Sequence, residues 1–548
     1  MATDTDRIFS EFKEHSVAEF FKKNRQMLGF SGKTRSLTVI VHEYITNSLD
    51  ACEEAGILPE ITVKIDEIDK EKYRVGVQDN GPGIPKKHVG KALGQMLAGT
   101  KFHRFAQQRG QQGIGASGCT MYAQITTGKP VKFVSEYDSK RIRGEISVDV
   151  KTNTPKLDIF AEEENPEKTH GVHVEGEFGE CKYDRSSFGA YEYVKRTALA
   201  NPHATITLIE PTGERLSYPR SHAVVPPKPE SIQPHPLGLT ISDLIEMAHH
   251  EPEFTRLSSF LQNRFSRVSS AKVQEVAALA QEVDFNKKPK DLEWSEAEMI
   301  IKAFSQVKWM APATDCVRPI GREQIEKSLR NILGPQFVAV TERSPKIYRG
   351  GIAFMAEAAL AYGGGAGKRI GDSVGGDIIR YANGAPLLFD AAGCAITEAV
   401  KEIDWKRYHI RNFEEEPISV LVNVASVYVP YTTAGKQAIS QEEEVYMEIK
   451  NAVMEAAREL QRHLSGLHRE KDRANRRAAV MRYVRQLSKD LSELANKGKA
   501  EELNKKLVHL IETKYMGQIE DGEDDDGGNG KNGKNGKNGN GEEDEKEE

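Results

Sequence analysis

Cysteine is scarce in this chain, which has 5 cysteines among 548 residues and no Cys-x-x-Cys pair. Scattered thiols argue against a zinc site and against a disulfide framework, so we expect all of them to be reduced. Apolar runs are short, because none approaches the length of a membrane span, and no basic and apolar leader follows Met1. We therefore expect a cytoplasmic protein without a membrane partner.

The sequence also lacks a P-loop for nucleotide phosphates. It has two Gly-Lys pairs, at 32–33 and at 367–368. A P-loop needs a glycine five positions before such a pair, and those positions hold Met27 and Tyr362. The glycine-rich stretch 363–367 is therefore interpreted as a flexible loop.

Charge is distributed unevenly along the chain. The formal net charge is −6, but residues 520–548 alone contain 12 acidic and 4 basic side chains, which leaves a small positive balance elsewhere. Any contact with nucleic acid must then come from local basic patches and not from the field of the whole protein. The same terminal segment is a low-complexity run that cannot bury a core, so we expect it to be disordered.

A chain of this length is too long for one hydrophobic core and is expected to form several domains. A proline cluster from Pro219 to Pro236 marks a linker after the first. The pattern predicts an α/β multidomain protein with five parts: an α/β sandwich at 1–228, a small all-α domain at 229–307, a second α/β domain with a long C-terminal helix at 308–470, a basic helical extension at 471–516 and a disordered acidic Gly/Asn-rich tail at 517–548.

Hydrophobic periodicity predicts the elements of the first two parts. A short helix at 10–21 would join the core or form a strap to a second protomer. It is followed by a helix at 36–55 and by strands at 61–68, 73–78, 131–137, 142–150, 171–178 and 204–210. The second part is helical from 240 to 307. Its basic turn, Arg264 to Lys272, is either a solvated connection or a phosphate contact whose hydroxyls also cap a helix.

The third part combines strands at 337–341, 377–381 and 418–429 with helical patterns at 354–361 and 393–403. A highly charged helix follows Ser440. Its apolar residues recur every three or four positions, at Ile449, Val453, Ala457, Leu460, Leu464 and Leu467. Such a stripe either binds a partner protein or packs inside its own domain, and we expect it to bind the partner.

Candidate ligand-binding residues gather in three segments. Glu43 and Asn47 stand four residues apart in the helix at 36–55, so a carboxylate and a carboxamide project from one face. Asp79 follows the strand at 73–78 and enters a Gly-Pro-Gly turn at 81–83, where missing side chains let a ligand approach the backbone. These residue types suit a base, a metal ligand and an acceptor for an adenine amino group.

The third segment, Arg109 to Gly118, alternates glycines with small or polar residues and leads into an apolar stretch that would begin a helix. Exposed backbone N–H groups at a helix start bind anions such as phosphates. Each segment alone also occurs in ordinary proteins. Their order and spacing together indicate a nucleotide pocket.

These motifs resemble the Bergerat nucleotide-binding fold of the GHKL ATPases, which include type II topoisomerases, heat-shock chaperones and histidine kinases. Three further segments, Gly99 to Phe102, Ala313 to Gly321 and Tyr431 to Lys436, are similar to stretches of the B subunits of type IIB DNA topoisomerases. The resemblance covers nearly the whole folded chain. It implies a GHKL ATPase domain with an N-terminal strap, a helix-two-turn-helix domain and a transducer domain for the first three parts.

The resemblance and the residue chemistry imply a role for each residue in ATP hydrolysis. Glu43 would be the general base, Asn47 the Mg²⁺ ligand and Asp79 the acceptor that reads adenine. Lys436 would reach the γ-phosphate across the domain interface and couple nucleotide state to the angle between domains. The remaining cofactor-binding candidates are Gly81, Gly83, Thr100, Lys101, Arg109, Gly110, Gln111, Gln112, Gly113, Ile114, Gly115, Ala116 and, for Asp79 or the base, Thr169.

The resemblance further implies the partners. They are ATP with Mg²⁺, a second copy of the chain in an ATP-dependent dimer, double-stranded DNA, and the topoisomerase A subunit, which cuts DNA within an A2B2 heterotetramer. No cleavage apparatus is evident in this chain. The candidate for the Asp-x-Asp element of a DNA-cutting magnesium site is Asp524 to Asp526, and these residues lie in the low-complexity tail. The alternative function is an ATP-dependent chaperone or clamp without a cleaving partner, which affinity for DNA would distinguish.

Overall fold

The structure is a computed structural model, and it describes residues 25, 29–96, 105–110, 113–149, 154–433, 435–495 and 499–514. The predicted strap helix, the acidic tail and four candidate site residues, Thr100, Lys101, Gln111 and Gln112, lie outside the described residues. By its internal contacts the chain divides into two compact units, 1–462 and 463–548. We describe each unit by itself.

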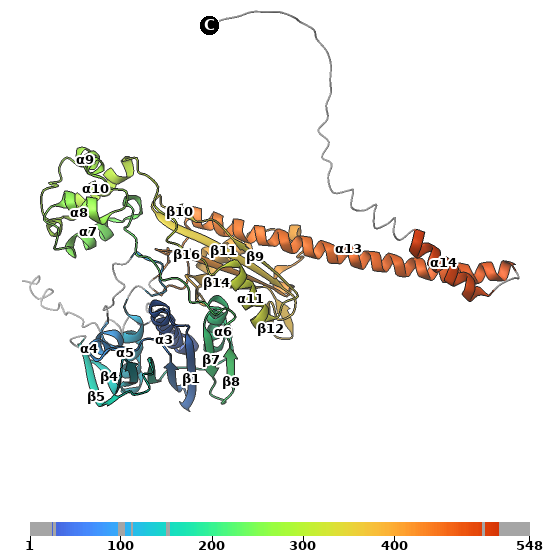
Figure 1. The fold of residues 1–548 in the computed structure, drawn as a ribbon, viewed down its shortest axis with the longest axis horizontal. Helices are drawn as coiled ribbons and strands as arrows, with labels where there is room; N and C mark the ends of the chain where they lie inside the picture. The colour runs from blue at the N-terminus through green and yellow to red at the C-terminus, as the bar shows by residue number, and fades with distance from the viewer. Residues whose placement is uncertain are drawn as a thin grey trace, which may run out of the picture. The chain divides into compact units, whose positions relative to one another are not determined.

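An eight-stranded sheet forms the base of the first unit, in the order β5-β4-β3-β6-β2-β1-β7-β8 (Figure 1). All neighbours pair antiparallel except β1 and β7. The strands are β1 (Glu60–Asp69), β2 (Lys72–Gln78), β3 (Val131–Tyr137), β4 (Lys140–Asp149), β5 (Thr154–Glu164), β6 (Gly171–Phe178), β7 (Thr205–Ile209) and β8 (Arg215–Tyr218). The six strands predicted for this part are confirmed. The prediction missed β5 and β8, the two edge strands.

Four helices pack on this sheet: α3 (Lys33–Ala55), α4 (Lys86–Gly94), α5 (Gly115–Thr127) and α6 (Ala190–Ala200). Figure 1 shows them on the side of the sheet that faces the second sheet. The predicted helix at 36–55 is confirmed as α3. Its buried residues Leu37, Ile40, Ile45 and Leu49 recur at helical spacing, and it ends at Gly56, whose left-handed backbone suits glycine.

A separate helical group follows, as predicted for 240–307. It consists of α7 (Ile241–His249), α8 (Leu257–Arg264), α9 (Ser270–Leu279) and α10 (Trp294–Gln306) around a core of their own. Thr240 caps α7 in a capping box with Asp243. Ser269 of the basic turn accepts a hydrogen bond from the Lys272 N–H, so the predicted capping hydroxyl is present.

The second sheet has the order β10-β11-β16-β14-β15, with β9 also paired to β11. Its strands are β9 (Phe337–Glu342), β10 (Lys346–Tyr348), β11 (Ile352–Tyr362), β14 (Asp377–Ala382), β15 (Ala385–Pro386) and β16 (Ile418–Ser426). Helices α11 (Arg322–Leu333) and α12 (Ala395–Lys401) accompany it, and β12 (Lys368–Ile370) pairs with β13 (Ser373–Gly375) in a small hairpin. The predicted α/β character of this part and its three predicted strands are confirmed.

The helix predicted at 354–361 is wrong, because these residues lie inside β11. Alanine-rich sequence favours helix by intrinsic propensity. Every residue from Ile352 to Ala361 is buried, however, and β11 has pairing strands on both sides. A strand covered on both faces shows no alternation of apolar and polar residues, so its pattern does not differ from that of a buried helix.

A single long helix, α13 (Glu443–Ala495), begins in the first unit and ends in the second. In the first unit its stripe residues Ile449, Val453, Ala457 and Leu460 are fully buried within this chain. The expectation that they bind a partner protein is therefore wrong, and the alternative, packing inside their own domain, holds. Arg343 strengthens this packing through ion pairs with Glu448 and Glu455 of the helix.

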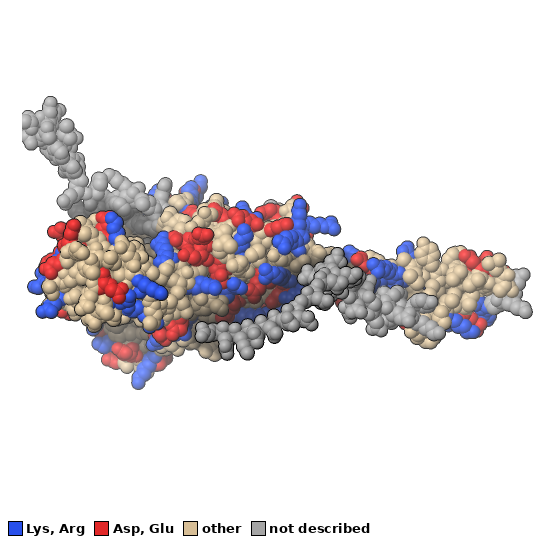
Figure 2. All heavy atoms as spheres, turned by 90° about the horizontal axis from the view of Figure 1, so that it is seen from above, with Lys and Arg blue, Asp and Glu red and all other residues tan. Residues whose placement is uncertain are grey.

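The second unit contains the rest of α13 and α14 (Ala500–Lys514). Val484 and Ser488 of α13 are buried there, and Arg477 pairs with Glu512 of α14. The helical character predicted for 471–516 is confirmed for the described residues. None of the described helices is both long and apolar enough to cross a membrane. On the face seen in Figure 2, basic and acidic side chains are interspersed.

Candidate nucleotide site

A cavity of about 900 Å³ opens between α3, α4, the start of α5 and a loop at 435–437. This volume is in the range of pockets that hold small-molecule ligands. The cavity brings together candidates from distant parts of the sequence: Glu43, Asn47, Gly83, Arg109, Gly110, Gly113, Ile114, Gly115, Ala116 and Lys436 all line it. His42, Thr46, His88, Lys91 and Ser117 line it too, and the sequence reasoning missed them.

Glu43 and Asn47 point from α3 into this cavity, as their helical spacing predicts. The Glu43 carboxylate lies directly against the backbone of Gly115. A Cβ atom at Gly115 would lie only 1.9 Å from Glu43 Oε2. Any other residue at position 115 would therefore displace this carboxylate.

The imidazole of His42 is a second polar group, next to Glu43. Its Nδ1 lies 2.9 Å from the Tyr193 hydroxyl, and its Nε2 lies 3.9 Å from Glu43 Oε1. Burial lowers the pKa of His42, and this effect outweighs the charge of the neighbouring Glu43 carboxylate, which raises it. The imidazole is therefore neutral at neutral pH. Its position next to Glu43 in α3 is a signal that sequence reasoning could have used, whereas Tyr193 of α6 gives no such signal.

The turn after β2 holds Asp79 by three donors. The Ser48 hydroxyl donates to Oδ2 at 2.7 Å, and the Gly81 and Val172 N–H groups donate to Oδ1 at 2.9 and 3.1 Å. Burial raises the pKa of Asp79, although each of these donors favours the carboxylate. Gly83 has φ of 76°, and a Cβ atom there would lie 2.0 Å from the Glu136 carbonyl oxygen. The turn therefore needs glycine.

The start of α5 has the features of an anion site. Its N-cap, Ile114, provides no side-chain capping bond, and no acidic residue stands in the first turn. The N–H groups at a helix start that lack a cap bind phosphates well, because the helix dipole adds a partial positive charge. Gly113, with φ of 58°, leads the chain into this helix in a left-handed conformation that suits glycine.

Lys436 reaches the cavity from the second α/β domain. Its loop is closed by a bridge between Tyr431 and Ile439 and by a hydrogen bond from the Lys436 N–H to the Thr433 carbonyl, 3.0 Å long. Next to it, the Gln437 carbonyl accepts a hydrogen bond from Arg380 at 3.3 Å. The loop is thus anchored on the second sheet while its lysine lines a cavity built mainly by the first domain.

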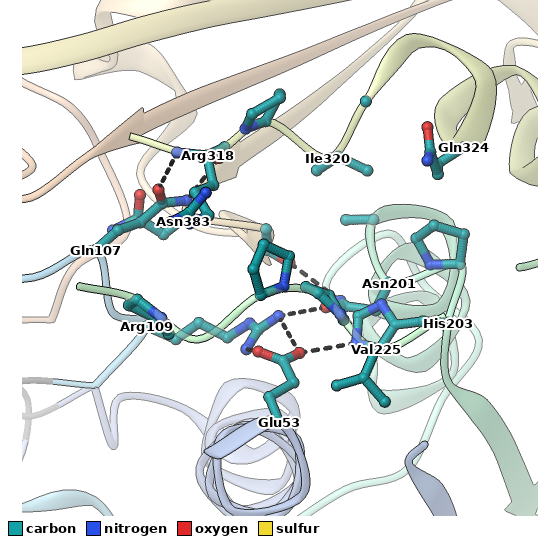
Figure 3. A pocket seen from close by; sticks show the side chains of 18 of the residues that line it. Glu53, Gln107, Arg109, Asn201, His203, Val225, Arg318, Ile320, Gln324 and Asn383 are labelled. Atoms are coloured by element: carbon teal, nitrogen blue, oxygen red, sulfur yellow. Dashed lines mark hydrogen bonds and ion pairs between the residues drawn. The ribbon is translucent and has the colours of Figure 1, made fainter. Parts of the chain in front are cut away.

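Arg109 lines the nucleotide cavity, but its guanidinium forms hydrogen bonds with residues of a second cavity (Figure 3). It forms two parallel hydrogen bonds of 2.8 Å with the Glu53 carboxylate and a third of 2.9 Å with Asp50. His203 also lies 2.8 Å from Glu53. Burial alone would raise the pKa of Glu53, but Arg109 and His203 outweigh it and lower this pKa to about 2. The guanidinium of Arg109 is therefore bonded to Asp50, Glu53 and Asn201, which all line the second cavity.

Asp79, Gly81 and Thr169 do not line the cavity itself. Asp79 and Gly81 adjoin it, because the turn that contains them continues into Gly83. Thr169 is exposed, and its hydroxyl donates to Asn165 Oδ1 at 3.1 Å. Its predicted contact with Asp79 or the base stays a prediction.

The described residues contain no group of three or more His, Cys, Asp or Glu side chains that would hold a metal ion by themselves. Mg²⁺ bound together with phosphates keeps several waters and takes few protein ligands. Asn47, exposed on the cavity wall, offers a side-chain oxygen of the kind that could bind it.

Comparison with known proteins agrees with this geometry. Residues 32–156 match the family of histidine kinase-, DNA gyrase B- and HSP90-like ATPases. The matched stretch includes α3, the turn after β2 and the start of α5. The fold and the site thus define an ATP-binding domain of this ATPase class.

Matches over the rest of the chain identify one family within this ATPase class. Residues 312–476 match the family described as the transducer of the topoisomerase VI B subunit. The chain is 47% identical over 502 residues to the B subunit of type 2 DNA topoisomerase 6 of Methanothermobacter thermautotrophicus, which covers 91% of this chain and 95% of that protein. It is 44% identical over 551 residues to the Pyrococcus horikoshii protein of the same name, covering 92% and 96%. The chain therefore belongs to the family of type 2 DNA topoisomerase 6 B subunits.

Family membership confirms the predicted resemblance, the α/β fold class with a GHKL domain and a transducer, and the enzyme class. The comparisons give no support to a chaperone or clamp. Among solved structures, the ATPase region of Saccharomyces cerevisiae topoisomerase II bound to ICRF-187 is similar, with a TM-score of 0.40, 11% identity, and coverage of 84% of this chain and 99% of that chain. A likeness this distant assigns no residue.

Proposed function

We propose that this chain is the ATP-hydrolysing component of a type IIB DNA topoisomerase and that the cavity between α3 and α5 is its ATP site. One observation carries the proposal. A carboxylate, a carboxamide, an uncapped helix start and a lysine from the second α/β domain line one cavity of about 900 Å³. Phosphoryl transfer to water requires these groups: a residue that orients the water, a metal ligand, and donors where charge develops.

Glu43 is proposed as the general base. The oxygen of a water molecule attacks the γ-phosphorus while the bond from this phosphorus to the oxygen of the β-phosphate breaks, and the water's proton passes to the Glu43 carboxylate. Neutral His42, 3.9 Å from Glu43 Oε1, does not compete as a charged partner for this carboxylate. When bound through Asn47, Mg²⁺ would neutralise charge on the phosphates.

Asp79 is proposed to read adenine, because its oxygens keep acceptor capacity beyond the three hydrogen bonds that hold them. Gly81 and Gly83 would leave room for the base. The backbone from Arg109 to Ala116, together with Thr100, Lys101, Gln111 and Gln112, would hold the phosphates, and Thr169 would assist at the base. Lys436 would bind the γ-phosphate and lose this contact after hydrolysis, which couples nucleotide state to the domain angle.

ATP-dependent dimerisation, the A2B2 assembly with the DNA-cutting topoisomerase VI A subunit, and passage of one duplex through the cut are proposed from family membership. In the basic turn, Arg264 pairs with Glu251 and Lys272 pairs with Glu275. Arg267, which is exposed, is then the residue most open to a DNA phosphate. Duplex binding should weaken as salt rises. We also propose the five-part division of the chain and a cytoplasmic location.

The decisive experiment for the ATP site is Glu43→Ala. Hydrolysis should fall by about 10²–10⁴-fold, the usual contribution of a general base, while binding of a fluorescent ATP analogue should persist. Asn47→Ala should in addition lose the Mg²⁺ dependence of binding. Equal hydrolysis by Glu43→Ala and the unchanged chain at saturating ATP would contradict the assignment.

A further inference from the structure

The second cavity, of about 430 Å³, lies between the first domain and the second α/β domain (Figure 3). Gln107, Gln108 and Arg109 line it, and Arg109 is the first residue of the phosphate segment at 109–118. Gly110, the next residue, lines the nucleotide cavity. This short stretch therefore has one end on the phosphates of the proposed ATP site and the other on the domain interface.

The first link runs from Gln107 to the transducer side. Its side-chain amide donates to the Arg318 carbonyl at 2.9 Å, and its carbonyl oxygen accepts from the Arg318 N–H at 2.6 Å. A glutamine thus pairs with a backbone residue in the manner of a neighbouring strand. Both bonds break together if the two domains separate at this point.

The link continues into the second sheet through buried Glu357 of β11. Its carboxylate accepts from the N–H groups of Ile320 and Gly321 at 2.9 and 2.8 Å, and from the side-chain amide of Asn423 at 2.7 Å. Asn423, on β16, in turn accepts from the Gly384 N–H at 3.1 Å. The segment that holds Gln107 is therefore fixed to the central strands of the sheet.

A return path closes the ring. Asn201 donates to the Gly384 carbonyl at 3.2 Å and accepts from the Arg109 guanidinium at 2.6 Å. Asn383 adds a cross-link by donating to the Gln108 carbonyl at 2.9 Å. Starting at Gln107 and ending at Arg109, a ring of hydrogen bonds and short backbone links, from Arg318 to Ile320 and across Gly384, connects these two residues through the transducer sheet.

From this ring we infer that Gln107 and Arg109 are positioning residues that connect the phosphate segment to the second α/β domain. Nucleotide contacts with this segment then set the angle between the domains independently of Lys436. The inference rests on the proposed ATP site. Its physical basis is the short backbone between them: a phosphate contact that pulls on Gly110 also pulls on Gln107 and Arg109, which then move the transducer with them or lose their hydrogen bonds.

The chain contains a matched control for Gln107. Gln124 makes the same pair of bonds to one backbone residue, donating to the Val148 carbonyl at 3.0 Å and accepting from the Val148 N–H at 2.9 Å. Both glutamines are half-buried. The Gln124 pair, however, joins α5 to β4 within the first domain, so its loss costs comparable stability without touching the interface.

The experiment measures the distance between spin labels at Thr212→Cys and Lys401→Cys, which are exposed sites on the two domains. All five native cysteines are buried, so the introduced thiols label selectively. In the full-length chain, a non-hydrolysable ATP analogue should shift the distance. Gln107→Ala should reduce this shift at least twofold and lower kcat more than it raises KM, whereas Gln124→Ala should leave the shift as it was.

A shift in Gln107→Ala equal to that of Gln124→Ala would overturn the inference. If Gln107→Ala fails to fold, Gln107→Glu replaces it, because its carboxylate still accepts from the Arg318 N–H but repels the Arg318 carbonyl. The same twofold loss of the distance shift is expected for this variant. An unchanged shift would count against the inference. The proposed function fails separately: it is contradicted if the unchanged chain does not bind the analogue at all.

Discussion

The two cavities at the boundary of the first domain and the transducer both contain Arg109, yet their polar groups differ in whether they are bonded to protein. In the nucleotide cavity, the helix start at Ile114 has no side-chain cap and Asn47 is exposed to the space. In the second cavity, Arg109, Glu53 and Asn201 are hydrogen-bonded to protein partners, and Glu357, buried behind it, accepts from the N–H groups of two lining residues. The first arrangement suits a ligand that completes the bonds, and the second suits a joint between domains.

The largest effect on the free energy of unfolding should come from removing the ion pairs of Arg109 in the second cavity. Arg109→Met would remove the guanidinium that pairs with both Glu53 and Asp50, although Glu53 would keep His203, and removing one member of a buried pair costs about 3–5 kcal/mol. Chemical denaturation should show this loss, and the double variant with Glu53→Gln should recover part of it. A loss below about 1 kcal/mol, the value of an exposed pair, would show that the joint is not a buried one.

In the nucleotide cavity, Gly115→Ala should act on chemistry and not on folding. The added methyl group displaces the Glu43 carboxylate, so hydrolysis should fall by about 10²-fold or more, although alanine favours a helix over glycine by about 1 kcal/mol. The control is Gly466→Ala in α13, where a Cβ atom has no neighbour within 4 Å. Normal hydrolysis by Gly115→Ala would contradict the close contact between Gly115 and Glu43.

The hydrogen bonds beside the second cavity should also respond to pH, because buried Glu357 accepts from Ile320 and Gly321, which line that cavity. Burial raises the pKa of this carboxyl to about 6 in the folded chain, above its ordinary value of about 4.3. A group whose pKa is raised by folding contributes stability below its unfolded pKa and loses it as pH rises through the folded pKa. Relative to Glu357→Gln, which does not titrate, the chain should lose about 2 kcal/mol of unfolding free energy between pH 4 and pH 8. Denaturation curves at several pH values check this, and a constant difference would contradict it.

The smallest effect is expected at the adenine end of the nucleotide cavity. Ser48→Ala removes one donor from Asp79, a hydrogen bond worth about 1 kcal/mol, so ATP should bind roughly fivefold more weakly. The matched control is Ser186→Ala, which removes a hydroxyl bond of 2.5 Å to Asp184 in an exposed position. Equal ATP affinities of the two variants would argue against Asp79 as the base-reading residue.

The sequence predicts the fold well where a strand has one buried face. The strands β1, β3 and β6 alternate buried with more exposed residues, and their predicted ranges agree closely with the structure. At the edge strand β5 no residue is fully buried, so the pattern gives little signal. In β11 nearly every residue is buried, and the pattern signals the wrong element. Periodicity is informative only between these extremes.

The candidate site divides in a similar way. Residues of one helix or one turn, such as Glu43 with Asn47, are predictable because local geometry alone places them on one face. The partners of His42 and Arg109 are not predictable in this way. Tyr193 and Glu53 come from segments far away in the sequence and meet them only through tertiary packing. For Lys436, only the family resemblance indicated that it would reach the cavity.

The backbone of Lys436 has φ of 51°, in the left-handed region that L residues other than Asn and Asp seldom adopt. Holding a lysine there costs about 1–2 kcal/mol that glycine would not lose. A random substitution to glycine at this position would therefore relax the loop. The same substitution would remove the amino group that lines the nucleotide cavity, so it would lower the strain of the loop and the cation content of the site together.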